Sequence, residues 1–234
     1  MTDTQAIRIL SAGAPKTGVR ACAEAFAAAS GEPFEIEFAT AAVIKERVTA
    51  GTANADLVVA PLPAMEEFAS AGQIEPERLS AIGSVTVGVV VRDGAREPDL
   101  TTVEAFTRAV LTADAVVYNK ASSGEYIARM LEKLGIADEV ASKTIRVPTG
   151  AAVMECLAAH PSDAVIGFGQ ITEIRLHDQL GTHLVGPLPE AIGKTTTYAA
   201  GPLSTAQRPD VARALADFMA APDGKRIFVA SGVM

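Results

Sequence analysis

Strand and helix patterns alternate along almost the whole chain of 234 residues. The first pair is an apolar strand pattern at residues 7–10, then apolar residues at helical spacing from Val19 to Ala29, which Ser30 and Gly31 bring to an end. Strands that alternate with helices belong to parallel sheets, because a helical crossover is needed to return the chain to the same end of the sheet. The alternation therefore predicts an α/β fold whose mostly parallel sheets are covered by helices.

Further strands and helices follow in the same order. Strands are expected at 34–38, 56–60, 85–91, 115–118, 144–147, 164–168, 184–185 and 195–200, and helices near 43–48, 63–68, 103–110, 122–134, 151–159 and 211–219. Two helices have capping-box patterns at their start, Thr101 with Glu104 and Ser122 with Glu125, and Gly135 is placed to end the second of them. No flexible linker interrupts the pattern, so two lobes would be joined by ordered crossover strands at 82–88 and 193–200.

Turns rich in hydroxyl groups and glycine stand where predicted strands meet predicted helices. They are Ser11-Ala12-Gly13, Thr40-Ala41-Ala42 and Ser122-Ser123-Gly124. Such turns present backbone N–H groups at helix N-termini, where the peptide dipoles leave partial positive charge. If the turns converge, they would hold a small oxyanion or carboxylate.

Composition excludes several other classes of function. A net charge of −8 without a basic run argues against a nucleic-acid partner, and no stretch is long and apolar enough to predict membrane insertion. The spacing of Cys22, Cys156 and the three histidines provides no metal site, and the cysteines are expected to be buried rather than disulfide-bonded. No phosphate loop, dinucleotide fingerprint or nucleophile elbow occurs in its required context, so we expect no cofactor.

Several segments, in the same order, resemble the molybdate-binding type of solute-binding protein, which has a type II periplasmic-binding fold. The similar segments include the Ser11-Ala12-Gly13 turn, the run from Gly51 to Val59, the helix pattern from Ser123 to Gly135, residues 165–168 and 185–189, and the C-terminal pattern from Asp217 to Gly232. The resemblance covers nearly the whole chain. Some relatives in this branch resemble enzymes that act on small tricarboxylic acids, for example aconitate isomerase.

The resemblance implies two α/β lobes with a ligand cleft between them. Lobe one would comprise residues 1–83 and 195–234, and lobe two residues 84–194. By the family pattern, Ser11, Ala12, Gly13, Thr40 and Ala41 would contact the ligand from lobe one, and Ser122, Ser123, Ala151 and Ala152 from lobe two. An exported protein of this type would deliver its ligand to the permease of an ABC transporter.

Three further side chains are candidate ligand contacts. Lys16 and Lys120 lie beside the serine-containing turns, where an ammonium group would neutralise a carboxylate. Gln170 follows the strand at 165–168, at a place where molybdate binders have tyrosine, and the Thr40 turn has two alanines where they often have serines. These changes remove hydroxyl groups that a tetrahedral oxyanion would use.

Three functions stay open from the sequence. The first is binding of an oxyanion or small organic acid for a transporter, the second is isomerisation of an unsaturated tricarboxylic acid, and the third is a ligand-sensing domain separated from a regulator. No motif nominates a catalytic base. The N-terminus has no export-signal pattern, which favours a cytoplasmic location, whereas removal of a leader would make the protein periplasmic.

Overall fold

The computed structural model describes residues 5–234, and the chain divides into two units. The first unit takes the chain up to Val85 together with Thr196–Met234, and the second is Thr86–Thr195. The boundaries fall within two strands, β4 (Ser80–Arg92) and β9 (Thr195–Pro202). These strands contain most of the two runs that the sequence predicts as crossovers.

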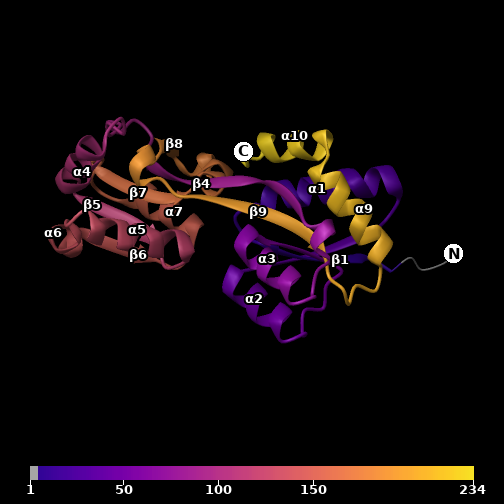
Figure 1. Ribbon diagram of the computed structural model, residues 1–234. Helices are drawn as coiled ribbons and strands as arrows, with labels where there is room; N and C mark the ends of the chain where they lie inside the picture. Colours follow the sequence, from indigo (N-terminus) through magenta and orange to yellow (C-terminus); the bar gives the residue numbers. More distant parts are fainter. Residues whose placement is uncertain (1–4) are drawn as a thin grey trace. The chain divides into compact units, whose positions relative to one another are not determined.

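The first unit is built from segments at both ends of the chain. Its other elements are β1 (Ile7–Ala12), α1 (Lys16–Ser30), β2 (Phe34–Ala39), α2 (Ala41–Thr49), β3 (Leu57–Pro61), α3 (Leu62–Ser70), a 3-10 turn at Pro76–Arg78, α9 (Pro209–Ala220) and α10 (Pro222–Ala230). The strand order is β2-β1-β3-β9, in which β1 runs parallel to β2 and β3, and β9 runs antiparallel to β3. In Figure 1 the indigo helix α1 lies beside the yellow helices α9 and α10, which pack against it.

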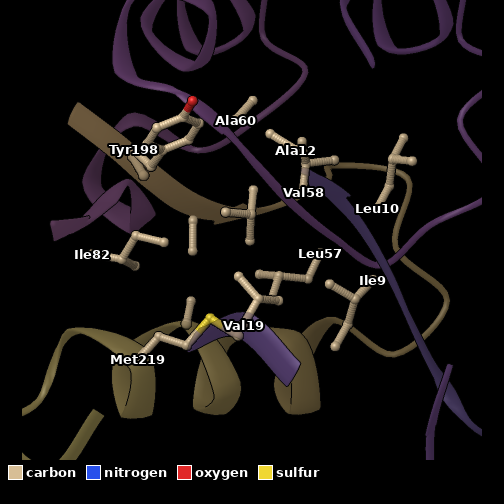
Figure 2. Close-up of a cluster of buried hydrophobic side chains, with 14 of the residues drawn as sticks. Ile9, Leu10, Ala12, Val19, Leu57, Val58, Ala60, Ile82, Tyr198 and Met219 are labelled. Carbon is tan, nitrogen blue, oxygen red and sulfur yellow. The ribbon is translucent and has the colours of Figure 1, made fainter. Parts of the chain in front are cut away.

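A cluster of buried aliphatic side chains holds this unit together. Figure 2 shows Ile9 and Leu57 from adjacent strands, with Val19 of α1 and Met219 of α9 beside them. Helix α1 approaches α10 closely, because a Cβ atom on Gly18 would lie 2.4 Å from the Phe228 ring. The N-terminal helix is therefore packed directly on the last helix of the chain.

Asp56 links three parts of the first unit. Its carboxylate is 1% exposed and accepts hydrogen bonds from the backbone N–H groups of Arg8 at 2.9 Å, Gln207 at 2.7 Å and Arg208 at 3.2 Å. Burial by itself would raise the pKa of Asp56, but these N–H groups and the Arg8 charge lower it below its usual value. The start of β3 is thereby tied to β1 and to the N-terminus of α9.

The second unit contains the remaining elements. They are α4 (Val103–Thr112), β5 (Ala115–Asn119), α5 (Ser122–Lys133), α6 (Ala137–Val140), β6 (Thr144–Val147), α7 (Gly150–Ala159), β7 (Val165–Gln170), α8 (Ile171–Leu176), β8 (Thr182–Pro187) and 3-10 turns at Ala141–Lys143, Asp178–Leu180 and Glu190–Ile192. The strand order is β4-β7-β5-β6, and β8 also pairs with β4. The pairs of β5 with β6 and β7 are parallel, whereas β4 is antiparallel to β7 and β8.

The expected α/β fold with mostly parallel sheets is confirmed, with differences in detail. Helices α6, α8 and α10 were not anticipated. Thr102, rather than Thr101, caps α4 by accepting the Ala105 N–H at 3.1 Å, because the Thr101 hydroxyl donates to Asp99 instead. Gly135 does end α5, with a left-handed φ of 72° that favours glycine. Within residues 5–234, no helix combines the length and apolar character needed to span a membrane.

Candidate functional site

Predicted ligand contacts of the first unit gather at one edge of its sheet. Strands β1 and β2 are parallel and in register at their carboxyl ends, where Ala12 pairs with Ala39. Gly13 and Lys16 follow the end of β1, and Thr40 and Ala41 follow the end of β2. Ligands of α/β sheets bind outside the carboxyl ends of the strands, so this edge has the expected location for a site.

Thr40 is the N-cap of α2. Its Oγ1 accepts the Val43 N–H at 3.3 Å, which fixes the hydroxyl and leaves its own proton to donate. The side chain is exposed, and the first-turn amides of Ala41 and Ala42 have no acceptor within the helix. This turn offers one oriented hydroxyl and two amides to an anion.

Ser11 differs from its expected place in a turn. Strand β1 continues through Ala12, so Ser11 lies inside the strand, fully buried, and its hydroxyl donates to the carbonyl oxygen of Ala12 at 3.0 Å. Pairing of β1 with both β2 and β3 extends the strand past the point where its apolar pattern ends. Of the first turn, Gly13 is more open, since no atom lies within 4 Å of a Cβ placed there.

The predicted contacts of the second unit also follow adjacent parallel strands. Asn119 at the end of β5 pairs with Val147 at the end of β6, and the preceding residue Tyr118 pairs with Phe168 of β7. The segments that leave these strands carry the following predicted contacts: Lys120, Ser122 and Ser123 after β5, Ala151 and Ala152 after β6, and Gln170 at the end of β7. Three neighbouring strands therefore bring the second group of residues to one edge.

Asn119, which sequence reasoning missed, organises the start of α5. Its Oδ1 accepts hydrogen bonds from the N–H of Ala121 at 2.9 Å and of Gly124 at 3.1 Å, and its amide contacts the buried Ser123 hydroxyl at 3.1 Å. The N-cap position is Ala121, so the expected capping box of Ser122 with Glu125 is wrong. The Glu125 carboxylate instead pairs with Arg146.

Close approach of α5 to β5 makes this arrangement specific. A Cβ on Gly124 would lie 1.7 Å from the Asn119 carbonyl oxygen, so only glycine fits there. The Asn119 side chain accepts the N–H groups of Ala121 and Gly124. The first-turn amides of Ser122 and Ser123 have no acceptor within the helix. An asparagine at the end of an apolar strand, two residues before a turn amide, is the sequence signal for such an arrangement.

Thr149 is a second residue that sequence reasoning missed. It is the N-cap of α7, is exposed, and accepts the Ala152 N–H at 3.2 Å. The amide of Ala152 is thus engaged by Thr149, and Gly150 and Ala151 carry the other first-turn amides. The signal in the sequence is Thr149-Gly150 after the strand at 144–147, the same type of turn as at Thr40.

Gln170 and Glu173 stand at the start of α8. Gln170 is the N-cap residue, and its Oε1 is buried without a hydrogen-bond partner among residues 5–234. The Glu173 side chain lies over the α7 N-terminus, since a Cβ on Gly150 would be 2.4 Å from Glu173 Cγ and 3.2 Å from its Oε1. His177 Nε2 lies 3.5 Å from Glu173 Oε1. A carboxylate and an imidazole therefore accompany the amides of this edge.

Each unit also has a cavity away from these edges. One of about 520 Å³ involves α4 of the second unit, and one of about 490 Å³ lies along β1 and β2 of the first. Their described lining residues include none of the predicted ligand contacts.

The cysteines and acidic groups provide no metal centre in the described part of the chain. No cluster of three or more histidine, cysteine, aspartate or glutamate residues there could hold a metal ion. Cys22 and Cys156 are free cysteines, Cys22 fully buried and Cys156 half-buried. Burial raises the pKa of the Cys22 thiol to about 12.

Comparison with known proteins gives a consistent result. The profile of a family described as "Bacterial extracellular solute-binding protein" matches residues 7–233. An aconitate isomerase from Pseudomonas sp. is 28% identical over 236 residues, which cover 97% of this chain and 87% of that protein.

Two solved structures share the fold over almost the whole chain. The substrate-binding domain of a protein from Clostridium difficile, described as a molybdenum ABC transporter, has a TM-score of 0.76 and 14% identity, covering 97% of this chain and 96% of that one. The periplasmic molybdate-binding protein of Azotobacter vinelandii has a TM-score of 0.72 and 14% identity, covering 97% and 98%.

Proposed function

Because the chain belongs to the bacterial extracellular solute-binding protein family, we propose that it binds a small anion, and an organic carboxylate in preference to a tetrahedral oxyanion. The observation that carries the proposal is the gathering of capped helix N-termini at the carboxyl edge of parallel strands in each unit. The amides near Thr40 in the first unit, and those near Ser122 and Thr149 in the second, are the groups that would donate to an anion. Since helix N-termini favour anions, each set supplies attraction without a metal.

The side chains at these edges favour a carboxylate. Thr40 and Thr149 supply two oriented hydroxyl groups. Lys16, Lys120 and Gln170 add ammonium and carboxamide donors. An ammonium group neutralises a carboxylate as a point charge, and amides donate within the carboxylate plane. As a solute-binding component, the protein would act outside the cytoplasm and present this ligand to a transporter permease.

A thermal-shift panel tests the binding proposal. The panel comprises molybdate, tungstate, sulfate, citrate and cis- and trans-aconitate, and a true ligand at about 100 times its Kd stabilises the folded state by roughly 2.7 kcal/mol. We expect a carboxylate to give the largest shift and Lys120→Met to reduce it. The matched control is Lys225→Met in α10, because Lys225 belongs to a helix outside both edges. Absence of a shift with every anion, or equal shifts in both variants, would refute the proposal.

The second candidate function is isomerisation of an unsaturated tricarboxylic acid, favoured by the 28% identity to an aconitate isomerase over nearly the whole chain. Such a reaction needs a base that takes a proton from the methylene carbon. The electron pair left behind forms the new double bond, the old double bond shifts its electrons to the far carbon, and that carbon accepts a proton. Glu173, beside the α7 amides and His177, is the group that we propose for this transfer.

Proton NMR of the aconitates with the protein distinguishes the two functions. Interconversion of the cis and trans forms would establish the enzyme, and Glu173→Gln should then abolish turnover while a carboxylate still shifts the melting temperature. Glu155→Gln, an exposed position in the middle of α7, should turn over normally. If a carboxylate binds and the cis and trans forms do not interconvert, the result supports ligand binding for a transporter and contradicts the isomerase function.

A further inference from the structure

The cavity of about 520 Å³ in the second unit is separate from the candidate anion site. Its lining includes Ala113, two residues before β5 begins, and Ala164 and Val165, which lie at the amino end of β7. The candidate contacts follow the opposite, carboxyl ends of the same strands. A strand rises about 3.3 Å per residue, so the five residues of β5 separate the two edges by about 15 Å.

Aliphatic side chains form much of the cavity wall. They are those of Val91, Ala105, Ala109, Ala113, Ala164, Val165 and Ile166. The small alanines of α4 leave room between this helix and the strands, and the volume is within the range of small-molecule pockets. An apolar group that entered would leave water for an aliphatic surface, which is favourable.

The three acids that line the cavity each contact another side chain. Glu97 contacts His183 at 3.1 Å, Asp99 accepts a hydrogen bond from the Thr101 hydroxyl at 2.6 Å, and Asp163 forms an ion pair with Arg92 at 3.1 Å. Hydrogen bonds from Thr101 hold the pKa of Asp99 below its usual value, with a smaller effect from the Arg108 charge.

The two lining arginines, Arg96 and Arg108, are different. Across residues 5–234, neither guanidinium makes an ion pair or a hydrogen bond, and both side chains are exposed. A guanidinium presents donors in a planar fork that matches a carboxylate. Two such groups beside an aliphatic wall offer guanidinium donors to a ligand, since no salt bridge ties either of them to an acid in the described part of the chain.

We propose that this cavity is a second binding site, for a monocarboxylate with an apolar body such as a medium-chain or aromatic acid. The carboxylate contacts Arg96 and Arg108, and the apolar body packs against α4 and the start of β7. The inference does not depend on the anion site proposed above. It adds a ligand class that the small polar anions of that site do not include.

Titration with octanoate tests the proposal on the full chain. Isothermal calorimetry should show saturable binding that weakens with added salt, because exposed charges are screened. Amide NMR shifts should concentrate at residues 105–113 and 163–166, and the double variant Arg96→Ala with Arg108→Ala should bind at least about 10-fold more weakly, the loss of roughly 1.4 kcal/mol. Ala109→Phe should block the cavity.

Matched controls separate this site from general effects. Arg175→Ala, an exposed arginine in α8, should leave octanoate affinity unchanged, and Arg108→Lys should retain part of it. Saturating citrate should not displace octanoate. The proposal is overturned if octanoate shows no saturable binding, if the NMR shifts lie elsewhere, or if the double arginine variant, with a normal melting temperature, binds as well as the unmodified chain.

Discussion

The side-chain oxygen of Asn119 lies 3.1 Å from the amide nitrogen of Gly124, so the last residue of strand β5 holds the first turn of helix α5. The same oxygen accepts the Ala121 N–H at 2.9 Å. This side chain is 4% exposed and satisfies two helix-terminal donors that the serines were expected to serve. It therefore positions the amides of Ser122 and Ser123 at the candidate site.

Replacement Asn119→Asp should weaken anion binding more than it affects folding. Aspartate retains an oxygen acceptor for both amides and suits a helix N-terminus, so the unfolding free energy should change by no more than about 1 kcal/mol. Its negative charge stands where we propose that the ligand binds, and repulsion should lower affinity by about 10-fold or more. Urea unfolding and calorimetric titration measure the two effects. Unchanged affinity for a ligand that stabilises the parent protein would contradict the site.

Substitution Gly124→Ala should destabilise the second unit. The new methyl would lie 1.7 Å from the Asn119 carbonyl oxygen, so α5 must shift, which costs about 1–3 kcal/mol. Gly13→Ala is the matched control, since its new methyl meets nothing within 4 Å and its φ is not left-handed. Its unfolding free energy should stay within about 0.5 kcal/mol of the parent. Equal urea midpoints for the two variants would show that α5 does not approach β5 so closely.

Asp56→Asn should destabilise the protein at neutral pH and have little effect in acid. Three backbone N–H groups and Arg8 lower the folded-state pKa of Asp56, so its ionised form stabilises the fold above its unfolded pKa, and this contribution is lost as pH falls through the folded pKa. At pH 7 the expected loss is about 1–3 kcal/mol, because hydrogen bonds to a charged acceptor are strengthened. Urea unfolding from pH 7 to pH 3 measures the trend. Glu24→Gln, an exposed position in α1, should follow the parent at each pH.

Cys22 should resist alkylation in the folded protein. Burial raises the pKa of its thiol to about 12, and its Sγ lies 3.7 Å from the Gly224 carbonyl oxygen, so little thiolate is present or accessible at pH 8. Cys156 is half-buried, although burial also raises the pKa of its thiol, and should react first. Mass spectrometry after iodoacetamide treatment, with urea-unfolded protein as the reference, identifies the modified residue. Preferential modification of Cys22 in native buffer would contradict its burial.

Local patterns in the sequence were sufficient for the main elements of the fold. Apolar periodicity located the strands around β1, β5 and β7 and the helices that follow β1 and β5, because buried positions recur at fixed intervals in each type of element. Helices α6 and α8 were missed, since four and six residues are too few for a helical period to emerge, and the nine-residue helix α10 was missed as well. The ends of strands were also uncertain: β1 extends through Ser11 because pairing with two neighbours continues beyond the apolar run.

The candidate site was predictable as a set of turns but not as a set of contacts. Thr40 caps its helix through its own hydroxyl, as local chemistry suggests, whereas the helix after Ser122 is capped by a side chain from the preceding strand. Which side chain accepts the first-turn amides depends on how closely the helix approaches the strand. A sequence pattern contains no information on that distance. Glu173 likewise reaches Gly150 from another segment, 23 positions along the chain.

The first unit is assembled from both ends of the chain, and this has a consequence for biosynthesis. Strand β9 pairs with β3, α10 packs on α1, and Asp56 accepts amides from Gln207 and Arg208. The ribosome makes β9, α9 and α10 only after the whole second unit. Domains generally fold as they emerge during synthesis, so the second unit can fold before the first is complete. The N-terminal third of the chain must therefore wait, with β3 unpaired on one side, until translation is nearly complete.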